Sequence, residues 1–214
     1  MRKPTTVASL NELGRVRLSP NFFMREFLYS EIANLHGIPN IPDHPDRAIE
    51  AGRGLCQNLL EPLNATFGRV VVRSGYRSPE VNGFGNAQMK AGKAGYSCSR
   101  NEANYGHHIW DRSEPGDALG ATATIVIPWF VDRFEAGESW VALAWWIHDH
   151  LPYGAMTFFP KLAAFNLHWS EKPERRIDSY AHPNGLLTKP GMPNHEGNHS
   201  TFYPGFPKLI ATYL

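Results

Sequence analysis

A run of helix-spaced apolar residues that leads directly into a β-branched strand most constrains the fold of this chain. From residue 45 onward, small or apolar residues recur every three or four positions, which is the spacing of one helix face. These residues are Ile49, Gly52, Cys56, Leu59 and Leu63. Gly68 ends the pattern, and the valines at 70–72 begin a strand. The sequence therefore predicts a helix that packs on a sheet.

The remaining elements follow an order of helices first and strands later. Ser19-Pro20 has the composition of an N-cap followed by a first-turn proline, and it predicts a helix that ends at Gly37. Strands are predicted at 121–128, 155–159 and 164–169, with an edge strand at 175–180 and a helix at 139–151. We therefore predict an α+β fold, with N-terminal helices packed on a mostly antiparallel sheet.

Length and charge indicate one domain with short extensions. The chain has 214 residues, with 21 basic and 20 acidic side chains and a net charge of +1. A nearly neutral chain lacks the positive charge that holds nucleic acid or an anionic membrane surface, so we expect neither partner. We divide the chain into a weakly structured lead-in (1–18), a domain (19–181) and a Pro/Gly-rich arm (182–214).

The first residues contain no apolar segment of signal-peptide length, and no run reaches the ~18 apolar residues of a spanning helix. We therefore expect synthesis in the cytoplasm, with delivery by another route if the protein acts outside. Two cysteines, Cys56 and Cys98, are too few for a disulfide framework.

The segment from Arg73 to Pro79, Arg-Ser-Gly-Tyr-Arg-Ser-Pro, carries the clearest functional signal. A strand ends at Ser74, Gly75 permits a sharp exit, and a new helix can begin after Ser78. This geometry holds Arg77 at a strand end, where a fixed guanidinium suits bidentate binding of a carboxylate. The alternative is that Arg77 bonds backbone carbonyls and only fixes the loop. The local residues do not distinguish carboxylate binding by Arg77 from a purely structural role in the loop.

This block resembles the zinc D-alanyl-D-alanine carboxypeptidases. The resemblance covers residues 18–180 and rests on the block with Asn82, on Asn58–Leu63 with Phe67-Gly68, and on Leu18–Phe22 with Glu26-Phe27. The family includes vancomycin-resistance dipeptidases, phage endolysins that cut peptidoglycan peptides, and the hedgehog signalling domain. The resemblance implies a hedgehog-like fold and a zinc ion held by two histidines and one aspartate. It also implies a glutamate base and an arginine that orients the substrate carboxylate or stabilises the developing oxyanion.

The family pattern carries over to particular positions of this chain. Arg77 matches the catalytic arginine, and together with Ser74 and Tyr76 it would bind the substrate. The segment Gly106-His107-His108 matches the surroundings of the first zinc-binding histidine, with His108 as the better candidate of the two. His168 matches the second histidine, on a later strand.

The third ligand departs from the pattern. Thr124 stands where the resemblance places the strand aspartate, and eleven residues separate His108 from Gly120. Asp111 lies in this insertion, three residues after His108, and is the preferred substitute; Asp117 is the alternative. Catalytic zinc normally takes three protein ligands and one water, so the third ligand decides whether the ion is held firmly.

The general base departs as well. Phe165 occupies the position three residues before His168 where many members carry glutamate, and Glu171, three residues after it, is the substitute. Side chains alternate along a strand, so Glu171 faces away from His168 unless the strand has ended.

Other histidines have simpler readings. His148 and His150 flank Asp149 at the end of a tryptophan-rich helix. They could bind a metal, but a surface role at the helix C-terminus is the expectation. His195 and His199 lie in the arm and are expected to be solvated.

Two functions follow as expectations. The first is a zinc-dependent peptidase that cleaves peptidoglycan stem peptides as a carboxypeptidase or endopeptidase. Without a signal peptide, such an enzyme fits a phage lysis protein or one carried in a virion and released to the cell wall. The second is an inactive member of the same fold that binds the cell wall or serves in virion assembly. Its arm, residues 182–214, would then contact another copy or a virion neighbour.

Overall fold

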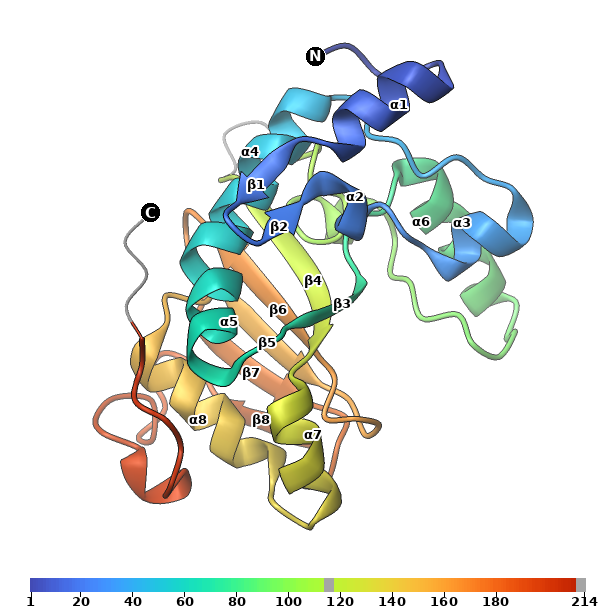
Figure 1. The fold of residues 1–214 in the computed structure, drawn as a ribbon. Coiled ribbons are helices and arrows are strands. Elements are labelled where there is room, and N and C mark those ends of the chain that lie inside the picture. The colour runs from blue at the N-terminus through green and yellow to red at the C-terminus, as the bar shows by residue number, and fades with distance from the viewer. Residues whose placement is uncertain (114–117, 211–214) are drawn as a thin grey trace.

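The computed structural model describes residues 1–113 and 118–210, and it is built around a six-stranded sheet (Figure 1). The strand order is β3-β4-β6-β5-β7-β8, and β1 and β2 form a separate pair. All pairs are antiparallel except β5 with β7. The strands are β1 (Arg17–Ser19), β2 (Phe22–Phe23), β3 (Val71–Ser74), β4 (Gly120–Val126), β5 (Ala155–Phe158), β6 (Phe165–Ser170), β7 (Arg176–Ser179) and β8 (Gly185–Thr188). The predicted α+β class and mostly antiparallel sheet are confirmed.

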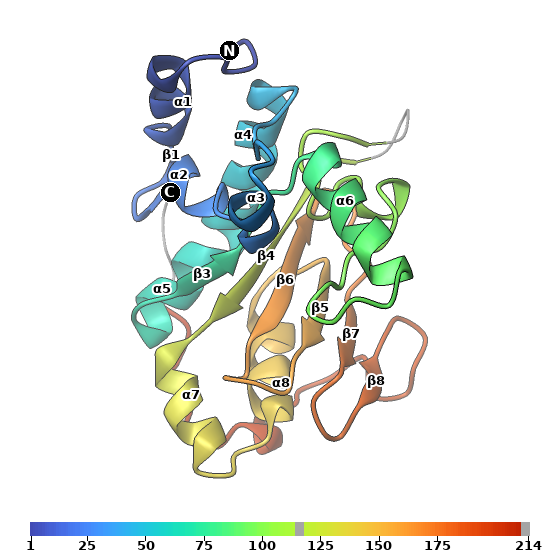
Figure 2. The same ribbon diagram turned by 90° about the vertical axis from the view of Figure 1, so that its right-hand side faces the viewer.

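Helices cover one face of this sheet and flank the other (Figures 1 and 2). They are α1 (Val7–Gly14), α2 (Met24–Phe27), α3 (Glu31–His36), α4 (Pro45–Leu55), α5 (Glu61–Phe67), α6 (Pro79–Lys90), α7 (Pro128–Glu135) and α8 (Trp140–His150). A π-helical stretch, Cys56–Leu60, joins α4 to α5, so the predicted helix runs from Pro45 and ends at Gly68. Gly68 has φ 81°, a conformation that favours glycine.

Alternation along β4 separates the two faces of the sheet. Ala121, Ala123 and Ile125 are fully buried and belong to the core shared with the helices. Thr122 and Thr124 point to the opposite face, because side chains alternate along a strand. The core face is thus apolar, and the other face carries the polar residues that form the candidate site.

The N-terminal region is more ordered than the sequence indicates. The lead-in contains α1, which is capped by reciprocal hydrogen bonds between Thr6 and Ser9. The predicted start of a helix at Ser19-Pro20 is wrong, because Ser19 lies in β1 and its hydroxyl donates to the Glu61 carboxylate at 2.7 Å. The predicted end at Gly37 is confirmed, since Gly37 is the C-cap of α3. Glu61 also accepts from the Asn21 backbone at 2.7 Å. This buried carboxylate draws the segment into a β-turn-β unit, and only the short α2 and α3 follow.

Helix α6 begins after Ser78, where the sequence indicates that a new helix can start. Two further elements were not predicted: α7 follows β4, and β8 forms the sheet edge beside β7. Strand β7 is therefore internal, whereas the sequence predicts it at the edge. In the described part of the chain, no helix has both the length and the apolar character needed to cross a membrane.

Candidate functional site

The Ser-Gly-Tyr-Arg block is anchored at the end of β3 by backbone contacts. The Tyr76 N–H donates to the carbonyl of Phe27 at 2.9 Å, and the Arg77 N–H donates to that of His108 at 2.7 Å. A Cβ on Gly75 would lie 2.8 Å from the Cβ of Phe27, so only glycine fits this close approach. The predicted cap is also present, because the Ser78 hydroxyl accepts from the N–H of Val81.

The Arg77 side chain is half-buried and turned into the loop. Its Nη1 donates to Cys98 Sγ at 2.9 Å and to Asn82 Oδ1 at 3.3 Å. Within residues 1–113 and 118–210, no carboxylate lies within ion-pair distance of this guanidinium, and its buried Nε has no hydrogen-bond partner. Burial consequently lowers the pKa of Arg77. Arg77 thus ties down the loop through side chains, and Cys98 and Glu31 only partly offset the effect of burial on its pKa.

Three imidazoles gather on the polar face of the sheet, and one of them, His108, lies beside Arg77. His168, on β6, stacks on His107 with ring centroids 4.3 Å apart. The Nδ1 atom of His168 lies 3.1 Å from the Thr122 hydroxyl on the neighbouring strand. His108 places its Nδ1 2.9 Å from the carbonyl oxygen of Gly75, which makes this nitrogen the donor. The structure therefore brings both predicted histidines to one region, together with His107.

These imidazoles are kept neutral by their surroundings. Burial, reinforced by the neighbouring His107, lowers the pKa of His168 to about 3. Burial also holds the pKa of His108 well below its usual range, and Arg77 acts in the same direction. The pKa of His107 is lowered by burial and partly restored by Glu174. Neutral imidazoles are the form that binds a metal, yet His108 and His168 are only 5% and 8% exposed.

Asp111 does not join the predicted ligand set. Its Oδ2 accepts the backbone N–H groups of Asp43 and His44 at 2.7 and 3.1 Å, and its Oδ1 accepts the Tyr76 hydroxyl at 3.0 Å. With 1% of its surface exposed, Asp111 fixes the loop at 43–44 onto the block. His108, Asp111 and His168 therefore do not form a three-ligand site among the described residues. The alternative ligand, Asp117, lies outside them.

The remaining predicted residues also have other partners. Strand β6 ends at Ser170, and the Glu171 carboxylate, just beyond it, accepts the Leu119 N–H at 2.7 Å rather than facing His168. The Tyr76 hydroxyl is occupied by Asp111, and burial raises the pKa of this phenol. Ser74 is half-buried at the end of β3, opposite Thr124.

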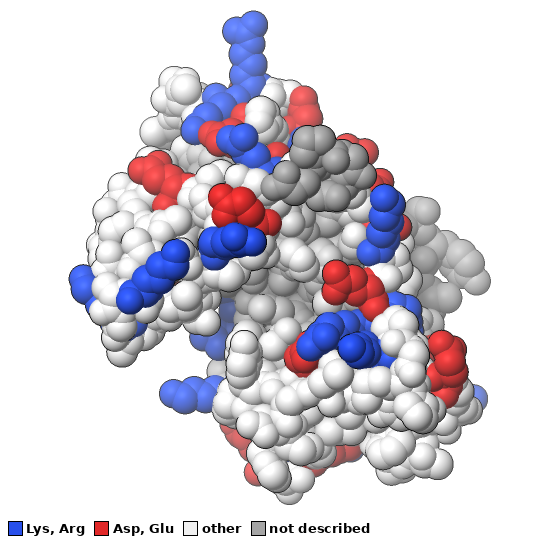
Figure 3. All heavy atoms as spheres, turned by 180° about the vertical axis from the view of Figure 1, so that it is seen from behind, with Lys and Arg blue, Asp and Glu red and all other residues white. Residues whose placement is uncertain are grey.

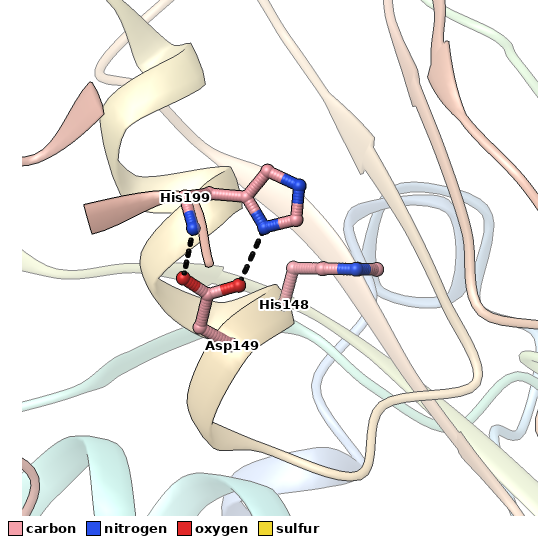
Figure 4. A group of neighbouring side chains, drawn as sticks. All are labelled: His148, Asp149 and His199. Carbon is pink, nitrogen blue, oxygen red and sulfur yellow. Dashed lines mark hydrogen bonds and ion pairs between the residues drawn. The ribbon is translucent and has the colours of Figure 1, made fainter. Parts of the chain in front are cut away.

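The sequence indicated only part of a second group of side chains, and the surface role expected for His148 is wrong, since this residue is 7% exposed. His148 and Asp149, at the end of α8, meet His199 from the arm, and these three could hold a metal ion (Figure 4). The Nδ1 atom of His199 lies 2.6 Å from Asp149 Oδ1. The expected solvation of His195 and His199 is wrong, since they are 5% and 6% exposed. The aromatic surface of α8 was the available signal, because His199 stacks on Trp145 there with ring centroids 3.8 Å apart.

Charge gives no further indication of a partner. Basic and acidic side chains are interspersed on the face seen from behind (Figure 3), in keeping with the net charge of +1. This face presents no broad surface of one sign that would steer a strongly charged ligand.

Comparisons with known proteins identify no relative. No family model matches the chain, and neither the curated proteins nor the solved structures contain a match.

Proposed function

We propose that this chain is a non-hydrolytic protein of the D-alanyl-D-alanine carboxypeptidase type that binds peptidoglycan stem peptides through their terminal carboxylate. The observation that carries the proposal is the half-buried Arg77 guanidinium, which has no carboxylate partner among the described residues. A cation in this state is stabilised by an incoming carboxylate. The neighbouring neutral imidazoles leave the positive charge of Arg77 available to such a ligand.

Binding without cleavage is favoured because Asp111 and Glu171, the two carboxylates expected to serve as zinc ligand and general base, have other partners. Asp111 accepts three hydrogen bonds that fix a loop, and Glu171 accepts one from the Leu119 backbone. Proton transfer by a positioned carboxylate contributes roughly 10²- to 10⁴-fold to such hydrolyses. With Asp111 and Glu171 engaged in this way, the site is better suited to recognition than to turnover.

The cell wall is a better-supported target than a virion neighbour. A role in virion assembly would require that the arm, residues 182–214, project from the domain and contact a neighbour. The described part of this arm packs on its own domain, where Trp146 Nε1 donates to the Pro207 carbonyl at 3.0 Å and His199 stacks on Trp145. These contacts occupy the arm within one chain.

A zinc peptidase is the second candidate, and one observation favours it. His107 stacks on His168 beside His108, so three neutral imidazoles lie in one region. Imidazole ligands suit zinc, and zinc would be the metal of such an enzyme. Its substrates would be the same stem peptides, with phage or virion delivery to the cell wall.

A peptide-binding experiment separates these functions. Calorimetry would use a stem-peptide analogue that ends in D-Ala-D-Ala, once with a free carboxylate and once amidated. We expect the free acid to bind at least tenfold more tightly than the amide, and Arg77→Gln to remove that difference. Arg73→Gln, at an exposed position of β3, is the matched control and should change nothing.

Each outcome decides between the candidates. Equal affinity for acid and amide would refute carboxylate recognition by Arg77. Release of D-alanine in the presence of zinc, lost in His168→Gln, would replace the binding proposal with the peptidase. Circular dichroism of each variant would exclude misfolding as the cause.

A further inference from the structure

The end of α8 and the C-terminal arm share a network of imidazole and carboxylate groups. His199 comes from the arm, and its ring lies flat on Trp145 with an interplanar angle of 3°. Its Nδ1 faces Asp149 Oδ1 at 2.6 Å, and its backbone N–H donates to Asp149 Oδ2 at 2.9 Å. His148 stands edge-on to the same ring, with centroids 5.2 Å apart (Figure 4). One ligand atom from each of His148, Asp149 and His199 lies within 4.8 Å of the others.

We infer that His148, Asp149 and His199 form a site for one divalent transition-metal ion that links the C-terminal arm to α8. This inference is independent of the proposed function, because the group lies outside the Arg77 region. Two imidazoles and a carboxylate suit zinc, cobalt, nickel or copper, whereas magnesium and calcium prefer sites made of oxygen alone.

The metal-site assignment is supported by the burial of the ligand side chains and by a pocket that connects them to solvent. The side chains of His199 and Asp149 are 7% and 12% exposed, so few waters compete with them as ligands. A pocket of about 570 Å³ adjoins the group, and His148, Asp149, His195 and Tyr203 contribute to its lining. An ion can enter through this pocket, which also leaves room for water at the remaining coordination positions.

The ligand orientations are already fixed by neighbouring groups, as in metal sites where a second hydrogen bond holds each ligand. The Nε2 atom of His199 lies 3.0 Å from the Asn194 carbonyl, which leaves Nδ1 for an ion. Asp149 Oδ2 accepts the Tyr203 hydroxyl at 2.7 Å, which leaves Oδ1.

His148 is held in the same manner. One of its ring nitrogens lies 2.7 Å from the Tyr153 hydroxyl, and the other lies 2.8 Å from the His195 carbonyl. An ion replaces one of these hydrogen bonds, and the other keeps the ring in place. Metal binding therefore exchanges two local hydrogen bonds, at His199 Nδ1 and at His148, for coordination bonds, without rearranging the helix.

An ion bound by these three residues would connect the C-terminal arm to α8. His148 and Asp149 belong to α8, whereas His199 precedes the 3₁₀ turn Ser200–Phe202 of the arm. A bound ion adds a connection between segments about fifty positions apart in the chain, and it stabilises the docked arm by mass action.

Metal titration of the full chain tests the inference. Protein treated with EDTA and dialysed would be titrated with zinc by calorimetry, and with cobalt by visible absorption. We expect one ion per chain and a cobalt spectrum of tetrahedral or five-coordinate type. His199→Gln and Asp149→Asn should each weaken zinc binding at least tenfold. His150→Gln is the matched control, because His150 lines the same pocket without belonging to the group.

Hydrogen exchange of the wild-type chain adds a readout that needs no variant to fold. Zinc should slow exchange in the segment 194–203 and at the end of α8. The inference is overturned if no ion binds, if both variants bind as tightly as wild type, or if zinc protects the region of His168 instead.

Discussion

Thr122 lies directly opposite His168 in the β4–β6 ladder, and its Oγ1 is 3.1 Å from Nδ1 of that imidazole. The sequence places Thr124 at the aspartate position of the resembled family, yet Thr124 pairs with Asn166, whose Oδ1 accepts its hydroxyl at 2.6 Å. Residues directly opposite in an antiparallel pair have Cβ atoms about 5 Å apart. Of these two threonines, Thr122 is therefore the one whose position can share an ion with His168.

Replacing Thr122 with aspartate should create zinc binding in this region. The new carboxylate would face His168, whose ring stacks on that of His107. A bound ion would compensate the cost of burying the carboxylate charge. We expect Thr122→Asp to bind zinc at least tenfold more tightly than Thr124→Asp, whose carboxylate would face Asn166. Calorimetry and metal analysis would measure both, in a His199→Gln background so that the α8 group does not contribute. Equal affinities would show that the register opposite His168 does not govern ligation.

Asp111 is expected to act as a structural carboxylate. Asp111→Asn keeps the shape but replaces one acceptor oxygen by a donor, which conflicts with the N–H groups of Asp43 and His44 or with the Tyr76 hydroxyl. We expect a loss of about 1–3 kcal/mol in the free energy of unfolding, measured by urea denaturation. Asp178→Asn is the control, because Asp178 forms a surface pair with Arg176. A loss of bound zinc without loss of stability would contradict this role.

The fold was predictable where local patterns and packing agree. The helix-spaced apolar residues from Ile49 to Leu63, followed by Gly68, predict a helix that packs on a sheet. The structure contains this helix, with its apolar residues buried and its end at Gly68. The helix after Ser19 fails because the local capping signal competes with a distant partner, Glu61, which captures the Ser19 hydroxyl. A hydrogen bond between residues 42 positions apart leaves no local signature in the sequence.

The candidate site was predictable only in part, for a similar reason. His108 and His168 could be identified by the motifs around them, and the structure brings both to the same face of the sheet. The partners of Asp111 could not be foreseen, because they are backbone groups at 43–44. The group at His199 could not be foreseen either, since it depends on the arm folding back onto α8.

Stability should fall in mild acid because His168 is buried as the neutral form. Its pKa is about 3 in the folded chain, below the ordinary value of 6.5 that applies after unfolding. The unfolded chain therefore takes up the proton first, so the stabilisation is complete above about pH 6.5 and is lost as the pH falls towards 3. Each such histidine contributes a slope of up to about 1.4 kcal/mol per pH unit.

Urea denaturation between pH 7.5 and 4 would measure this slope. We expect His168→Gln to be less stable than wild type at pH 7.5 and to have a shallower pH dependence, so that the two curves converge in acid. The slope of His44→Gln, whose side chain is exposed, should match that of wild type. His107, His108 and His148 retain their lowered pKa values, so some pH dependence will remain. An unchanged slope in His168→Gln would refute the assignment.

Gly54 should be intolerant of a methyl group, although it lies within a helix. Alanine is ordinarily favoured over glycine in a helix interior by about 0.5–1 kcal/mol. A Cβ at this position would overlap ring atoms of Trp169, so the indole or the helix must shift. We expect Gly54→Ala to lower the free energy of unfolding by about 1–3 kcal/mol, the usual cost of overpacking.

Gly83→Ala, in α6, is the matched control because the nearest atom to its Cβ would be 3.6 Å away, on Asn101. This variant should be as stable as wild type or more so. Equal effects of the two substitutions would mean that α4 does not pack on β6 as closely as the Trp169 contact requires.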